Sequence, residues 1–106
     1  MQYTLIVARM APQDSERVAG IWAESDATDL PHMVGVKHRR LFRFQGLYFQ
    51  LIGSEEGVGD RIEEVRGHPL FLDVNEKLKP HIDAYDPLTW RGPADAMATE
   101  FYSWNA

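Results

Sequence analysis

The sequence predicts an α+β fold in which one antiparallel sheet is covered on one face by two helices. Two amphipathic helical patterns alternate with strand-like stretches, and a hairpin pattern lies between them. The chain has 106 residues, of which 44% are hydrophobic and 25% are charged. This length suits one hydrophobic core and is too short for two, so we expect a single domain over residues 1–106.

The first strand and the first helix are predicted from the N-terminal quarter of the chain. Residues Tyr3 to Met10 are rich in β-forming side chains with almost no polar interruption, which is typical of an inner strand. Pro12 and the pair Asp14-Ser15 then supply the chemistry of a helix start. One face of this helix carries apolar side chains at helical spacing and ends at a serine: Val18, Ile21, Trp22 and Ser25.

Two aspartates follow the first helix. Asp26 and Asp29 lie at or just beyond its C-terminus, where the helix macrodipole disfavours carboxylates. Helix stability therefore does not account for acidic residues at these positions. Pro31 is expected to close the segment.

The middle of the chain predicts a β-hairpin. Residues Met33 to Phe44 and Leu47 to Gly53 have strand-like composition, and Gln45-Gly46 between them suits a tight turn. Side chains alternate between the two faces of a strand, so this hairpin sorts its residues into two sets.

A second helix and a last strand complete the prediction. A helical region begins over residues 60–64 and resumes after a break at Pro69, with one apolar stripe: Leu70, Phe71, Val74 and Leu78. Residues 86–97 have the composition of a long loop, and Thr99 to Asn105 predict the final strand.

The resulting order, β-α-β-β-α-β, is typical of a ferredoxin-like sandwich. In such a fold the second face of the sheet stays open, and here the hairpin would place large aromatic side chains on it. Because an open apolar face usually needs a partner, we expect a homodimer.

The hairpin stretch "HRRLFRFQGLYFQLI" interleaves basic and aromatic residues, as nucleic-acid-binding segments do. A two-residue turn pairs Phe44 with Leu47, Phe42 with Phe49 and Arg40 with Leu51. One face then carries His38, Arg40, Phe42, Phe44, Leu47, Phe49 and Leu51. The other face carries Arg39, Leu41, Arg43, Tyr48, Gln50 and Ile52. A nucleic-acid platform would place aromatics and cations on one exposed face. We therefore interpret the phenylalanines as core or interface.

The second, mixed face has two open interpretations. Arg39, Arg43, Tyr48 and Gln50 form either a solvated surface with an ordinary arginine–carboxylate pair or one wall of a pocket. In the pocket, a guanidinium and an amide would address the oxygen atoms of a small ligand.

Composition excludes several classes of function. The net charge of −5 opposes a general role on nucleic acid, since phosphate binding depends on a surplus of cations. The absence of cysteine excludes disulfides, thiol nucleophiles and thiolate metal sites, and no histidine or carboxylate spacing predicts a metal. The N-terminal "MQYTLIVARM" is too short for a membrane span and lacks a basic n-region, so a cytoplasmic protein is expected.

Four stretches of the chain together resemble a known family. They are "RMAPQD", "AESDATDLPHMVGVKHRRLFRFQGLYFQLI", "HPLFLDVNEKLKPHI" and "EFYSW". In this order and spacing they are similar to the small aromatic polyketide cyclases of the tetracenomycin F2 cyclase type, from actinomycete type II polyketide pathways. The resemblance implies a ferredoxin-like fold of the dimeric α/β-barrel type and a homodimer. It also implies no cofactor, and ring closure of an aromatic intermediate derived from a poly-β-ketone.

The resemblance also implies a site where the end of the first helix meets the hairpin. The aspartate of the family pattern falls on Asp26 and its arginine on Arg39, which we expect to be catalytic. Ser25 and Gln50 stand where the family pattern has histidines. These two residues are expected to bind substrate oxygens, because serine and glutamine do not carry protons near neutral pH as histidine does. Further substrate-binding candidates are Arg43, Tyr48, His32 and His38.

The expected reaction is an intramolecular aldol condensation followed by loss of water. Arg39 would stabilise an enolate or phenolate oxygen, and Asp26 would either move a proton or orient Arg39. His32 and His38 are candidates for a displaced proton shuttle. Two alternatives remain open: a cofactor-independent oxygenase of the anthrone-oxidising kind with the related dimeric fold, and a non-catalytic polyketide-binding member of the family.

Overall fold

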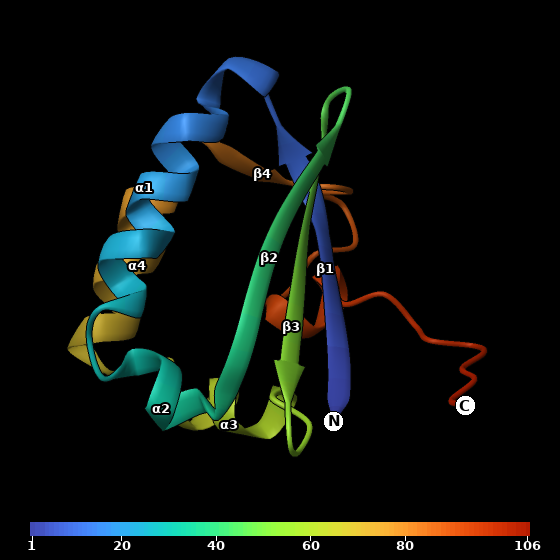
Figure 1. The fold of residues 1–106 in the computed structure, drawn as a ribbon. Coiled ribbons are helices and arrows are strands. Elements are labelled where there is room, and N and C mark those ends of the chain that lie inside the picture. The colour runs from blue at the N-terminus through green and yellow to red at the C-terminus, as the bar shows by residue number, and fades with distance from the viewer.

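The computed structural model describes residues 1–106 and contains one four-stranded sheet with its helices gathered on one face (Figure 1). The main elements are β1 (Gln2–Met10), α1 (Ser15–Asp26), β2 (Val36–Phe44), β3 (Leu47–Ser54), α4 (Pro69–Leu78) and β4 (Ile82–Ala84). Shorter ones are η1 (Pro12–Asp14), α2 (Leu30–Val34), α3 (Gly59–Val65) and η2 (Pro93–Ala96). The strand order is β2-β3-β1-β4 with every neighbouring pair antiparallel. The predicted ferredoxin-like α+β fold is confirmed.

The hydrophobic core lies between the sheet and the helices. The apolar stripes predicted for α1 and α4 face it, with Val18, Ile21 and Val74 all buried. The larger cluster of buried residues joins both helices to the sheet: Ile21, Leu30, Val34, Ile52, Val58, Ile62 and Val74. A smaller cluster near one end contains Ala8, Met10, Val18 and Tyr48. None of the helices is long and apolar enough to cross a membrane.

The hairpin has the predicted register. Phe44 pairs with Leu47, Phe42 with Phe49 and Arg40 with Leu51 across the turn at Gln45-Gly46. Gln45 adopts a positive φ of 52°, in the left-handed region that tight hairpin turns require. The face with Tyr48, Gln50 and Ile52 is buried beneath the helices.

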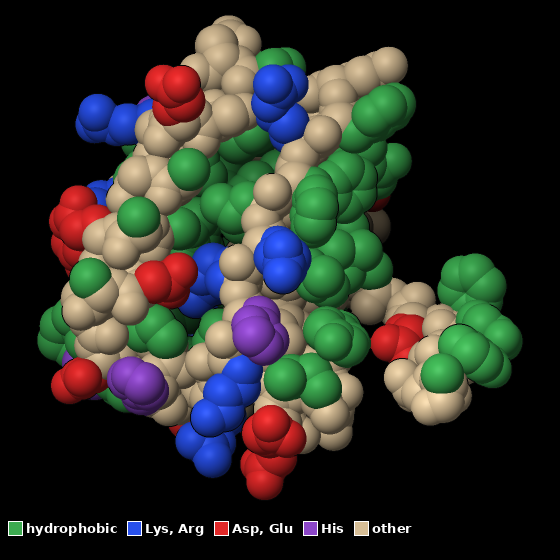
Figure 2. Space-filling model, in the orientation of Figure 1, with side chains coloured by type: hydrophobic (Ala, Val, Ile, Leu, Met, Phe, Trp, Pro, Cys, Tyr) green, Lys and Arg blue, Asp and Glu red, His purple; other side chains and the backbone are tan.

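The other face of the sheet is open. Phe42 and Phe44 are 52% and 64% exposed there. In Figure 2 hydrophobic side chains gather on the side of β2 and β3 that faces away from the helices. The interpretation of these phenylalanines as core is therefore wrong for Phe42 and Phe44, which leaves the interface interpretation.

The prediction of a strand over Thr99 to Asn105 is wrong. These residues have no regular secondary structure, and the chain leaves the body of the molecule here (Figure 1). The fourth strand is instead Ile82–Ala84, which pairs with the end of β1 through Ala8↔Ala84 and Met10↔Ile82. The edge of β1 beyond this pairing is bridged only by Met97, opposite Ile6. Three residues are too few to show a period of two, so β4 gave no sequence signal.

The segment between α1 and β2 also differs from the prediction. Pro31 lies in the first turn of the short helix α2 rather than closing a segment, a position where proline is favoured. Met33 and Val34 belong to α2, so β2 begins at Val36 and not at Met33. Gly35 ends α2 with φ 84°, a conformation that glycine adopts without steric cost.

Candidate active site

A cavity of about 450 Å³ lies between the sheet and the helices. Sixteen of the 22 residues that line it are hydrophobic, so it suits a largely apolar ligand. Its polar members are Arg39, Tyr48, Gln50, Asn75, Lys79 and Asp83. The loop that follows β4 closes part of the wall with Trp90, Pro93 and Ala96.

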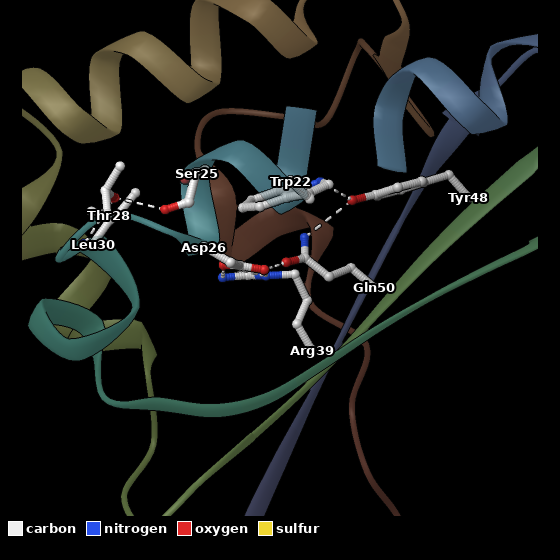
Figure 3. A network of polar contacts seen from close by, with 8 residues as sticks. All are labelled: Trp22, Ser25, Asp26, Thr28, Leu30, Arg39, Tyr48 and Gln50. Carbon is white, nitrogen blue, oxygen red and sulfur yellow. Dashed lines mark hydrogen bonds and ion pairs between the residues drawn. The ribbon is translucent and has the colours of Figure 1, made fainter. Parts of the chain in front are cut away.

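Arg39 is held on several sides at the wall of this cavity (Figure 3). Its Nε lies 3.1 and 2.9 Å from the two carboxylate oxygens of Asp26, and its Nη2 lies 2.9 Å from Oδ1. Its Nη1 donates to Oε1 of Gln50. The guanidinium carbon lies 4.1 Å from the centre of the Trp22 ring, a cation–π contact. The Arg39 side chain is only 10% exposed, and its planar donors match the Asp26 carboxylate in a two-pronged geometry.

Tyr48 continues this network. Its hydroxyl oxygen accepts a hydrogen bond from Trp22 Nε1 at 3.0 Å and another from Gln50 Nε2 at 3.2 Å. Burial raises the pKa of Tyr48 from 10.0 to about 12, although the hydrogen bonds from Trp22 and Gln50 and the charge of Arg39 lower it. Tyr48 is therefore a neutral phenol at physiological pH.

Two simple periodicities bring the network together. Trp22 and Asp26 are four residues apart on α1, so both project from one side of the helix. Tyr48 and Gln50 are two apart on β3 and share its inner face. Arg39 pairs with Ile52 on β3 and therefore lies diagonal to Gln50, within reach of a long side chain.

The structure brings four of the predicted site residues together and leaves four apart. Asp26, Arg39, Tyr48 and Gln50 form the network, and the last three also line the cavity. The four that lie apart from the cavity are Ser25, Arg43, His32 and His38.

Each of the four lies apart for a definite reason. Ser25 is buried on the α4 side of α1, in a small hollow that it shares with Leu70 and Val74. In Figure 3 its side chain lies apart from those of Asp26, Arg39 and Gln50. Arg43 is exposed near the turn of the hairpin, and His32 is exposed on α2. His38 is exposed and on the opposite side of β2 from Arg39, since the two are neighbours in a strand.

The sequence prediction did not give Trp22 a role in the site. It was placed in the apolar stripe of α1, where it does pack against both hydrophobic clusters. Its indole also contacts Arg39 and Tyr48. The spacing of four between Trp22 and Asp26 is the signal that links it to the site. Nowhere do three histidine, aspartate or glutamate side chains converge as metal ligands would.

The raised pKa of Tyr48 predicts a loss of stability at alkaline pH. The unfolded chain releases this proton near pH 10.0, whereas the folded protein holds it up to about 12. The contribution is therefore complete below the unfolded pKa and falls as the pH rises through the folded one. The difference between these two pKa values corresponds to roughly 2–3 kcal/mol of unfolding free energy.

Urea unfolding followed by circular dichroism, from neutral pH upwards, measures this effect. The stability difference between wild type and Tyr48→Phe should shrink as the pH rises through this range. Tyr85→Phe is the matched control, because Tyr85 is 53% exposed. A difference that stays constant with pH would contradict the prediction.

Comparisons with known proteins agree with the resemblance in the sequence. The family model described as polyketide synthesis cyclase matches residues 2–105. The tetracenomycin F2 cyclase of Streptomyces glaucescens is 43% identical, over 96% of this chain and 93% of its own. The polyketide synthase CurG of Streptomyces cyaneus is 46% identical, over 98% of this chain and 97% of its own. The solved structure of the tetracenomycin F2 cyclase from S. glaucescens, a type II polyketide cyclase, superposes with a TM-score of 0.94 at 42% identity. That superposition covers 100% of this chain and 99% of the other.

Proposed function

This chain belongs to the polyketide synthesis cyclase family and is an aromatic polyketide cyclase, and we propose that it closes a ring by an aldol condensation without a cofactor. The observation that carries the proposal is the cavity itself. An apolar chamber of about 450 Å³, with Arg39, Gln50 and Tyr48 joined by hydrogen bonds on its wall, suits a flat polyketide that carries oxygens.

The cavity would contribute first by folding the substrate. The methylene or methyl carbon and the ketone that react belong to one molecule, and holding them in contact can lower the barrier by ~7–11 kcal/mol. The apolar walls favour a compact, stacked conformation of the polyketide over an extended one in water. This contribution needs no acid or base from the protein.

Arg39 would stabilise the negative charge that develops on oxygen. A guanidinium has five N–H donors. Asp26 and Gln50 engage three of those of Arg39, which leaves two for a substrate enolate or phenolate. Because Asp26 is already paired with Arg39 and does not line the cavity, we assign it to orienting the guanidinium rather than to removing the proton.

Gln50 and Tyr48 would bind substrate oxygens beside Arg39. The predicted substrate-binding roles of Ser25, Arg43, His32 and His38 have no support from the cavity lining. The two histidines are exposed, so a shuttle built on them would have to act from outside the cavity.

The experiment that tests this function uses tetracenomycin F2, the compound in the name of one relative, as substrate. Purified protein should convert it to a product lighter by one water, detected by liquid chromatography and mass spectrometry, with no uptake of oxygen. Oxygen consumption with an anthrone substrate would instead support the oxygenase alternative. Tight binding of tetracenomycin F2 with no conversion would support the non-catalytic alternative.

We further propose that the protein acts as a homodimer whose subunits meet at the open face of the sheet. This face exposes Tyr3, Phe42 and Phe44, an apolar surface of the kind that marks an interface. The C-terminal segment that follows adds Phe101, Tyr102 and Trp104, at 96%, 76% and 72% exposure. In Figure 2 these aromatics lie apart from the body of the molecule, where a second copy would cover them.

The dimer gives a direct prediction. The double variant Phe42→Glu/Phe44→Glu should be a monomer, because buried unpaired carboxylates oppose association. Size-exclusion chromatography with light scattering measures the mass. Leu72→Glu is the matched control, since Leu72 is 48% exposed on α4, on the other side of the molecule. A double variant with the same mass as wild type would exclude this face as the interface.

A further inference from the structure

The family pattern does not identify the residue that moves protons in this site, because Gln50 stands where that pattern has a histidine. The hydrogen bonds of the network nonetheless have a definite direction. A guanidinium has donors only, so the Gln50 atom that faces Arg39 must be the carbonyl oxygen Oε1. The amide Nε2 of Gln50 then has to face the Tyr48 hydroxyl and donate to it.

Trp22 imposes the same direction on Tyr48. An indole N–H is also a donor only, and Nε1 of Trp22 lies 3.0 Å from the Tyr48 oxygen. The phenol oxygen therefore accepts two hydrogen bonds, from Trp22 and from Gln50, and its own proton is left over. No side-chain or backbone group of the protein accepts that proton.

The hydroxyl proton of Tyr48 has no acceptor in the protein, so a ligand in the cavity is the acceptor that remains. Tyr48 is 3% exposed, so bulk water does not surround its hydroxyl, and the residue lines the cavity beside Arg39. The arrangement is a phenol whose oxygen is held by two donors and whose hydrogen is available to a ligand in the cavity.

We propose that Tyr48 is the catalytic residue that gives a proton to the oxygen of the reacting ketone, with Gln50 as the positioning residue that turns its hydroxyl toward the cavity. This inference rests on the aldol condensation proposed above. In this proposal the proton-carrying role of the family's histidine passes from position 50 to Tyr48, two residues away on the same face of β3.

The proposed cycle begins and ends with Tyr48 protonated. Solvent removes the first proton of the acidic methylene, the enolate carbon attacks the ketone, and a C–C bond forms while the ketone oxygen becomes an alkoxide. The O–H bond of Tyr48 breaks and the O–H bond of the new alcohol forms, which leaves a phenolate on Tyr48. The phenolate takes the second proton from the attacking carbon, and the C–O bond breaks. Hydroxide leaves and combines with the proton that solvent took up, so one water is lost and Tyr48 is restored.

The surroundings of Tyr48 suit both halves of this cycle. An alkoxide resembles hydroxide in its basicity, and the pKa of its conjugate acid lies well above that of a phenol. The proton therefore moves downhill from Tyr48 even though burial raises the Tyr48 pKa to about 12. The phenolate that results already faces the N–H groups of Trp22 and Gln50, with the charge of Arg39 nearby.

Two variants with tetracenomycin F2 test the proposal. Tyr48→Phe keeps the ring and loses the hydroxyl, and kcat should fall by roughly 10²–10⁴, the usual contribution of general acid–base catalysis. This fall should exceed the rise in KM that comes from the lost contact with a substrate oxygen. Gln50→Glu keeps the bond to Arg39 but replaces the donor by an acceptor. The Tyr48 hydroxyl should then donate to Glu, away from the cavity, and kcat should fall although the phenol is still present.

The controls separate chemistry from folding. Tyr85→Phe makes the same change at an exposed position outside the cavity lining and should keep wild-type kcat. Circular dichroism and thermal unfolding confirm that each variant is folded. A folded Tyr48→Phe protein with kcat within about twofold of wild type would overturn the proposal, as would full activity in Gln50→Glu.

A second measurement does not depend on turnover. Alizarin, a flat phenolic dye, changes its visible absorption when its hydroxyl ionises, and donors in the cavity should lower the apparent pKa of the bound dye. Loss of the Tyr48 hydroxyl should raise that pKa toward its value in water, whereas Tyr85→Phe should leave it unchanged. If wild type bound alizarin in this way but did not convert tetracenomycin F2, the substrate would be wrong and the donating hydroxyl of Tyr48 would stand. An unchanged dye pKa in Tyr48→Phe would overturn the role of Tyr48.

Discussion

Replacing Arg39 by alanine should lower the turnover of tetracenomycin F2 by roughly 10²–10³, the usual cost of removing a donor that faces a developing oxyanion. The guanidinium is held by Asp26, Gln50 and Trp22 before any substrate arrives, so little reorganisation is needed during reaction. Its loss removes both remaining N–H donors at the cavity wall and releases Gln50 to rotate. Steady-state kinetics with detection of the dehydrated product measures the effect.

Two further variants test whether the effect of Arg39→Ala is specific to the guanidinium at this position. Arg39→Lys keeps the charge but cannot bond two-pronged to Asp26 and reach Gln50 together, so it should recover little activity. Arg17→Ala removes an exposed arginine from α1 and should behave as wild type. Near-normal turnover in a folded Arg39→Ala protein would remove the guanidinium from the mechanism.

Replacing Trp22 by alanine should have the second large effect, because it should lower both the stability of the fold and the rate of turnover. The indole packs against both hydrophobic clusters, and truncating a tryptophan in a core costs about 3–5 kcal/mol of unfolding free energy. The same change removes the ring beneath the Arg39 guanidinium and one of the two donors to Tyr48. Denaturant unfolding and kinetics on the same samples measure both losses.

Trp22→Phe separates the two roles. Phenylalanine keeps an aromatic ring against Arg39 and most of the packing, but it has no N–H. Its stability should therefore lie much closer to wild type than that of Trp22→Ala, while kcat should still fall because Tyr48 loses one of its two donors. If Trp22→Phe retained full kcat, the hydrogen bond from Trp22 to Tyr48 would have no part in the reaction.

The alternation of side chains in the hairpin was the most informative part of the sequence. A period of two, with a two-residue turn at Gln45-Gly46, correctly gave the register and placed Arg39, Tyr48 and Gln50 on one face. These are the three site residues that line the cavity. The proximity of these three residues to Asp26 could not be derived from periodicity, because it depends on how α1 crosses the sheet. It was predicted only from the resemblance to the family.

Where the prediction was wrong, the signal was local and the structure depends on distant partners. The stretch Thr99 to Asn105 is strand-like in composition but pairs with no strand, and the three residues of β4 take the end of β1. Ser25 lies three residues after Trp22, on the same broad face of α1. The surface of α1 is shared between α4 and the cavity, and Ser25 lies on the α4 side. A helical period alone does not say where that division falls.

The closed pair of Asp26 and Arg39 has a consequence for how ligands reach the protein. Two cations line the cavity and both are paired, Arg39 with Asp26 at 2.9 Å and Lys79 with Glu76 at 3.0 Å. The protein as a whole carries a net charge of −5. No surplus of cations at the cavity is available to attract an anionic ligand from afar, and no layer of counterions is displaced when one binds. Ionic strength, which screens charges beyond about 10 Å at 0.1 M salt, should therefore change affinity little. Recognition in this cavity depends on the positions of its donors at short range.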